Sequence, residues 1–163
     1  MSVSGDERTP ADGIGSDRLV VFCFFLVGSL AVWIVGIPPL DYPSPRLVLS
    51  GLLALMLLLS LSALGGVLLP PCALLFGALA EHTAGLALLP IQEGFTPDTR
   101  LLCSSFLLVP IFYVLAVQGM NVSASFQAML RQGGPTARIL FQRKLLSLAF
   151  FALLGFAVIF YFF

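Results

Sequence analysis

Two adjacent side chains that could do acid–base chemistry, Glu81 and His82, lie in an otherwise apolar stretch of the sequence, FGALAEHTAGLALLP (76–90). Between Leu47 and Gln92 they are the only Asp, Glu, Lys, Arg or His residues. A carboxylate and an imidazole can transfer protons, bind cations or act as a general base and acid. In a helix, however, adjacent side chains point about 100° apart, so we do not expect the two groups to face one another as a working dyad.

The residues around this pair do not match a metal site. Ligands on a helix recur at i and i+3 or i+4, and the only other polar residue within reach is Thr83. His82 is the only histidine of the chain, and no GxGxxG, GxxxxGKS/T or GxSxG motif is present. We therefore expect no catalytic residue, no metal ion and no cofactor, and we expect that the protein is not an enzyme.

Three interpretations of the pair stay open. Glu81 can be buried against a neighbouring helix in its protonated form, which desolvation favours. The helix can instead be broken at EHTAG (81–85), which would place Glu81, His82 and Thr83 in a polar cavity or a partner groove. In the third interpretation, Glu81 carries protons or binds a substrate.

Small residues share a helix face with the glutamate. Gly77, Glu81 and Gly85 occur at i, i+4 and i+8. Small residues at four-residue spacing let membrane helices approach closely. The pattern predicts that Gly77, Glu81 and Gly85 contact another helix or a partner protein.

The composition of the whole chain is that of an integral membrane protein. Of 163 residues, 59% are hydrophobic and only 10% are charged, whereas a soluble domain carries roughly a quarter of charged residues. Membrane lipid is therefore the expected solvent of most of its surface, and we expect a multi-pass protein of the cell membrane. The net charge is zero, so we expect no nucleic-acid partner.

The apolar stretches predict an all-α, polytopic transmembrane bundle of about five helices. A span needs about 20 mostly apolar residues, and glycines followed by prolines in ALGGVLLPP (63–71) divide the longest apolar stretch into two. The fourth span contains Pro110 and can continue as a helix to Leu130. We predict a disordered cytoplasmic tail over residues 1–18 and spans at about 19–37, 47–64, 71–91, 101–118 and 145–163.

The basic residues predict the orientation. A cytoplasmic N-terminus and an external C-terminus would place most Lys and Arg residues inside, as the positive-inside rule requires, and only Arg46 and Arg100 outside. The decisive stretch, RQGGPTARILFQRK (131–144), has four cations and no acid. We expect these cations to fix the topology and to contact anionic lipid headgroups; they are Arg131, Arg138, Arg143 and Lys144.

Two stretches resemble the stage II sporulation protein M family. LSALGGVLLPPCALLFGALAEHTAG (61–85) is similar to that family's junction, where one span ends in a glycine-rich turn and the next opens after a proline. LLVPIFYVLAVQGMNVSAS (107–125) is similar to its stretch with a proline inside an apolar helix, followed by a Gln/Gly element and small polar residues. The resemblance implies a non-enzymatic anchor in a sporulation complex of an endospore-forming bacterium, with cell-wall hydrolases as partners.

Two functional hypotheses follow. The first is a membrane scaffold or anchor that binds other membrane proteins; the resemblance implies that it acts in the peptidoglycan remodelling of engulfment. The second is a small transporter, or the membrane subunit of one, in which Glu81 and His82 line a path. Short loops and small-residue faces favour the first, and the sequence shows no repeated halves of the kind many transporters have.

Overall fold

The computed structural model describes residues 11–35, 45–92, 96 and 98–163, and every structural statement below concerns these residues. In them the chain is all-helical, as predicted. Its helices are α1 (Ala11–Val35), α2 (Pro45–Ser60), α3 (Gly65–Gln92), α4 (Thr99–Gln132) and α5 (Pro135–Phe162).

Four of these helices are long and apolar enough to cross a membrane, which is consistent with a multi-pass membrane protein. Within the described residues the candidate spans are Asp17–Val35, Gly65–Leu88, Thr99–Arg131 and Pro135–Phe162. The fifth helix, α2, has 16 residues and is therefore roughly 24 Å long, somewhat less than the hydrocarbon core. The structure thus contains the five expected helices, one of them short.

The end of α2 comes earlier than the predicted Leu64 because serines interrupt the helix. Ser60 Oγ donates to the carbonyl of Met56 (2.6 Å), and Ser62 Oγ donates to that of Leu59 (2.8 Å). The Leu64 amide donates to Ser62 Oγ (3.2 Å). Such local side-chain bonds offer the backbone an alternative to the helix, so residues 61–64 form a turn.

All five helices begin before their predicted first residues, and α1 and α5 differ most from the prediction. α1 includes residues 11–18, so the predicted disordered tail is wrong over that part, and residues 1–10 lie outside the described chain. α5 begins at Pro135, a residue favoured in a first turn, directly after Gly133 ends α4 with a φ of 61°.

α3 begins at Gly65, so Pro70 and Pro71 lie inside its first two turns rather than opening it. Proline has no N–H, so the helix omits two backbone bonds there. Only the amides of residues 65–68 lack intrahelical acceptors in any case, so the two prolines leave the carbonyls of Gly66 and Val67 without their bond from four residues further along. α4 continues beyond Leu130, to Gln132, as the sequence allowed.

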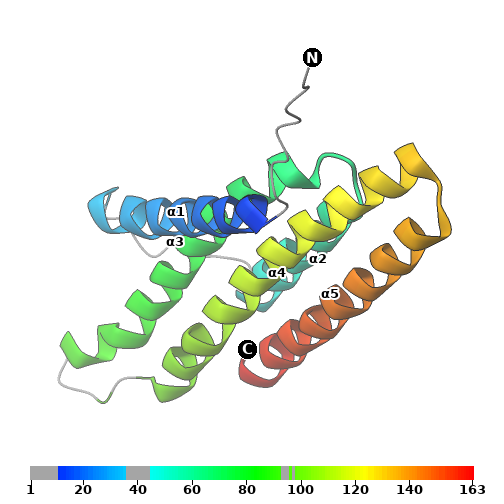
Figure 1. Cartoon of the computed structure of the whole chain (residues 1–163). Coiled ribbons are helices and arrows are strands. Elements are labelled where there is room, and N and C mark those ends of the chain that lie inside the picture. The colour runs from blue at the N-terminus through cyan, green and yellow to red at the C-terminus, as the bar shows by residue number, and fades with distance from the viewer. Residues whose placement is uncertain (1–10, 36–44, 93–95, 97) are drawn as a thin grey trace.

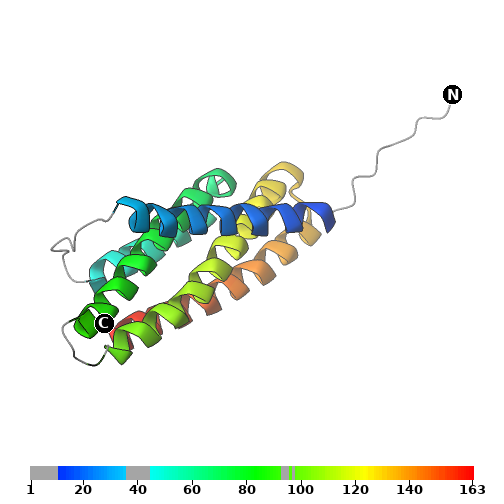
Figure 2. The ribbon, with the colours of Figure 1, turned by 90° about the vertical axis from the view of Figure 1, so that its left-hand side faces the viewer.

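Helices α2 to α5 run alternately up and down beside one another, whereas α1 lies across α3 and α4 (Figures 1 and 2). The bundle therefore has two ends. The hairpin end contains the α2–α3 and α4–α5 turns, and the opposite end contains the start of α2 and the end of α5. At the opposite end, the Arg46 guanidinium stacks over the Phe160 ring at 4.0 Å.

Aromatic rings connect α1, α3 and α4 in the core. The rings of Phe76 and Phe112 stack with centroids 4.0 Å apart, and Phe25 packs on Phe76 at 6.1 Å. Leu53 of α2 and Leu148 of α5 are fully buried and continue this core.

Glycines let α1 and α3 touch backbone to backbone. A Cβ added at Gly28 would overlap the carbonyl oxygen of Leu74, and one added at Gly77 would overlap that of Phe25. Both obstacles are backbone atoms, which no rotamer change can move. The crossing point of α1 on α3 is therefore fixed by these two glycines.

We predict that Gly77→Ala destabilises the protein by about 1–3 kcal/mol, because the methyl group must force α1 away from α3. The measurement is unfolding by denaturing detergent in mixed micelles. Gly85→Ala is the matched control, since nothing lies within 4 Å of a Cβ added there. Equal stability of the two variants would contradict the glycine crossing.

Candidate functional site: the polar segment of α3

α3 is continuous through Glu81, His82 and Thr83, so the broken-helix interpretation is wrong for this structure. The apolar residues on both sides and the packing of α1, α2 and α4 around it support an unbroken helix. On a regular helix three consecutive side chains fan out by about 100° each. The three polar groups therefore reach three different neighbours.

Glu81 faces α1. Ser29 Oγ donates a hydrogen bond to Glu81 Oε2 (3.1 Å), one turn of α3 beyond the Gly77 crossing. The carboxyl group is partly buried between the two helices. Gly77 and Glu81, which the spacing placed on one helix face, thus both contact α1.

Thr83 faces α4. Its hydroxyl lies 3.0 Å from Ser105 Oγ and donates to the carbonyl of Ala80 (2.9 Å). Each hydroxyl has one proton, so when Thr83 donates to Ala80, Ser105 donates to Thr83, and the carbonyl of Leu101, 3.1 Å from Ser105 Oγ, is the alternative acceptor. Both side chains are buried, with exposed fractions of 7% and 9%. This pair is a hydroxyl contact between two apolar helices.

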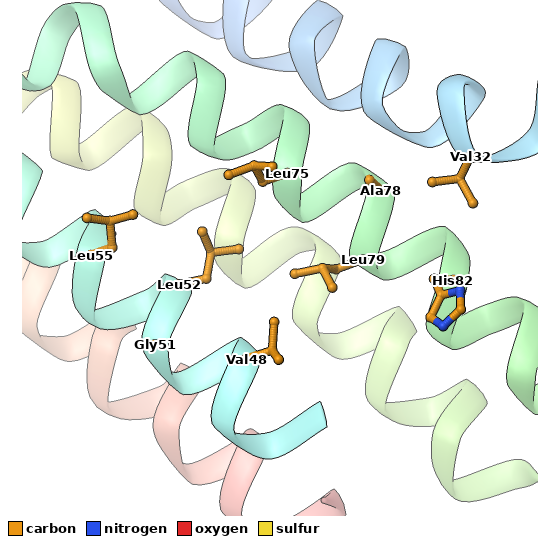
Figure 3. A pocket seen from close by; sticks show the side chains of 9 residues that line it. All are labelled: Val32, Val48, Gly51, Leu52, Leu55, Leu75, Ala78, Leu79 and His82. Atoms are coloured by element: carbon orange, nitrogen blue, oxygen red, sulfur yellow. The ribbon is translucent and has the colours of Figure 1, made fainter. Parts of the chain in front are cut away.

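His82 faces neither of these contacts. Its imidazole lines one end of an apolar cavity of about 400 Å³ between α1, α2 and α3, as Figure 3 shows. Glu81 and Thr83 do not line that cavity. The prediction that Glu81, His82 and Thr83 share one polar cavity is therefore wrong, because consecutive helical residues diverge.

Gly85 has a different environment from Gly77. It is exposed, and no atom lies within 4 Å of an added Cβ. Since α1 crosses α3 obliquely, the helices have separated two turns beyond Gly77. Gly85 is thus not part of a helix contact within the chain, and a contact with a partner protein stays a prediction.

The predicted cationic segment lies in the helical hairpin formed by α4 and α5. Arg131 lies in the last turn of α4, and Arg138, Arg143 and Lys144 lie in the first three turns of α5. The three arginines are exposed and Lys144 is half-buried. Phe126 and Phe141 hold the two helices together, with ring centroids 5.7 Å apart.

A polar contact that the sequence analysis missed fastens the α2–α3 turn to α4. Ser123 Oγ donates to the carbonyl of Ser62 (2.7 Å), and Gln127 Nε2 donates to that of Ala63. Gly119, one turn earlier on the same face, lies so close to Ser60 that an added Cβ would overlap its hydroxyl. The i, i+4, i+8 spacing of Gly119, Ser123 and Gln127 is the signal that could have indicated this contact.

The described residues contain no group of three His, Cys, Asp or Glu side chains able to hold a metal ion. Of the three polar groups of α3, two form hydrogen bonds with neighbouring helices and one lines an apolar cavity.

We predict a coupling of about 0.6 kcal/mol between Thr83→Val and Ser105→Ala, the typical value for hydroxyl contacts between membrane helices. Unfolding of both single variants and the double variant in mixed micelles measures it. Thr83→Val combined with the distant Ser123→Ala is the control pair and should be additive to within about 0.5 kcal/mol. Equal coupling in both pairs would contradict a specific Thr83–Ser105 contact.

Comparison with known proteins adds no homologue: no family model, curated protein or solved structure matches the chain.

Proposed function

We propose that the protein is a non-enzymatic scaffold or anchor within a multi-protein complex of the cell membrane. The observation that carries this proposal is the use of Glu81 and Thr83 in contacts to α1 and α4. The ionisable or polar groups most suited to chemistry inside the bundle thus stabilise helix packing. What the chain presents outward is a set of apolar helix faces and a cationic hairpin.

The more specific form of this proposal is a role in sporulation, as a membrane partner of cell-wall hydrolases during engulfment. It rests on the resemblance of residues 61–85 and 107–125 to the stage II sporulation protein M family. The order of the elements supports it, since a helix end, a turn and a proline-containing helix start follow one another from α2 to α3.

A transporter with Glu81 and His82 along one path has less support. The carboxyl group lies against Ser29 of α1, whereas the imidazole lines a cavity whose other lining residues are apolar. A path for a polar solute would need both groups, or water, on one continuous surface.

We predict that Glu81→Gln leaves folding and complex assembly unchanged, because a glutamine side-chain oxygen also accepts the Ser29 hydrogen bond. Affinity capture from the native membrane in mild detergent compares wild type with this variant, and cell-wall hydrolases are the expected partners. Glu81→Leu is the destabilising control, because it removes the acceptor.

A Glu81→Gln variant that assembles normally but abolishes the cellular activity would refute the scaffold and favour an ion path. Capture of a transport ATPase in place of hydrolases would likewise favour the membrane subunit of a transporter.

We propose further that the N-terminus lies in the cytoplasm and the C-terminus outside, because the hairpin end has the cations. Alkaline phosphatase fused after Phe163 should be active in wild type, since this reporter folds only outside the cytoplasm. Replacing the four hairpin cations with glutamine should reduce the activity strongly. Arg100→Gln, at the opposite end of the bundle, is the control and should leave the phosphatase activity high. The same activity with and without the four hairpin cations would contradict this orientation.

A further inference from the structure

The cavity beside His82 is a feature that neither the scaffold nor the helix contacts explain. Its volume is about 400 Å³, within the range of small-molecule sites. It is bounded by three helices (Figure 3). The lining residues are Val32 of α1, Val48, Gly51, Leu52 and Leu55 of α2, and Leu75, Ala78, Leu79 and His82 of α3.

The cavity exists because α1 and α3 separate beyond their crossing. Contact is closest at Gly28 and Gly77, and the lining residues Val32 and His82 lie about one turn further along each helix. α2 does not fill the resulting wedge, since Gly51 has no side chain and an added Cβ there would meet no atom within 4 Å. The glycines that bring two helices together thus leave a gap beside them.

The cavity has a polar end and an apolar end. α2 and α3 run antiparallel, so Val48 lies near Leu79 and His82, whereas Leu55 and Leu75 form the other end (Figure 3). Val48 is three residues from Pro45, the first residue of α2, or about 4.5 Å along the helix axis. The His82 imidazole is the polar side chain among the lining residues. Because it is at the same end of the cavity as Val48, it lies near the level where α2 begins.

The apolar end is open to the surroundings of the protein. Leu55 is 43% exposed and Leu75 is 52% exposed. In a chain whose outer surface is this apolar, the surroundings at that depth are lipid chains. Water does not fill an apolar cavity of this kind, because it needs two to four polar partners.

We propose that this cavity binds one acyl chain of a glycerophospholipid, with the ester carbonyl of that chain at the His82 imidazole. The apolar end takes the chain from the bilayer, and the polar end, near the level where α2 begins, takes the ester group. An imidazole N–H is a suitable donor to such a carbonyl. The polarity gradient along the cavity matches the gradient along the lipid.

A photoreactive phospholipid tests the proposal. The full-length protein is reconstituted into vesicles of phosphatidylethanolamine and phosphatidylglycerol with a trace of phospholipid carrying a diazirine midway along one acyl chain. Cross-linked peptides are mapped by mass spectrometry. We expect enrichment at Leu52, Leu55 and Leu75 over Phe150 and Leu153, two exposed residues of α5; equal labelling of both sets would overturn the proposal.

Gly51→Leu should fill the cavity and lower the cross-link yield at these sites about tenfold, which corresponds to a tenfold loss of affinity. Gly66→Leu is the matched control, because Gly66 also has open space at its Cβ but does not line the cavity. Monodisperse elution and helical circular dichroism show that both variants fold. An unchanged yield in folded Gly51→Leu would refute the site.

His82→Phe tests the polar end. It keeps an aromatic ring but removes the donor, and it should lower the yield about fivefold, as expected for the loss of one hydrogen bond. Competition identifies the occupant: unlabelled phospholipid should displace the probe. Displacement by palmitic acid but not by phospholipid would contradict a phospholipid at this site.

Discussion

Hydrogen bonding inside apolar surroundings is the constraint on which this structure depends. Within lipid a polar side chain finds no water, so its partner must come from the protein. Ser29–Glu81 joins α1 to α3, Thr83–Ser105 joins α3 to α4, and Ser123 with Gln127 joins α4 to the α2–α3 turn. Each hydrogen bond contributes little free energy, but it forms only when the two helices pack in one particular position. Apolar contacts between leucine-rich helices do not select one position in this way.

Glycine spacing decides where those bonds can form. Backbone contact at Gly28 and Gly77 brings Ser29 within reach of Glu81, and the small Gly119 brings α4 against Ser60. A larger residue at either place would separate the helices by more than a hydrogen bond can span. The oblique course of α1 follows from the same contact, since it touches α3 closely at one point and leaves most of its own surface exposed, including Trp33 and Ile34.

Hydrophobicity in the sequence was sufficient to predict five helices, because a span needs a long apolar run whatever it packs against. Hydrophobicity did not predict where the helices end. The side-chain bond of Ser60 near the end of α2 and the left-handed Gly133 after α4 depend on individual residues and not on the apolar pattern. At the site, periodicity placed Gly77, Glu81 and Gly85 on one helix face; Gly77 and Glu81 contact α1, whereas no atom lies within 4 Å of a Cβ added at Gly85. The three residues follow one straight face of α3, whereas α1 crosses that face obliquely and leaves it before Gly85. The angle between two packed helices cannot be predicted from the residue pattern of one of them.

The same reasoning separates His82 from its neighbours. Glu81 and Thr83 face helices that approach α3 closely, and both end in hydrogen bonds. His82 faces the side where α1 has already diverged and where α2 offers Gly51 in place of a side chain. A bulky residue at position 51 would have closed that side and raised the helix propensity of α2, so the open cavity is not required by the packing of the bundle. Of the three adjacent polar residues, the histidine is therefore the one whose surroundings leave room for a ligand.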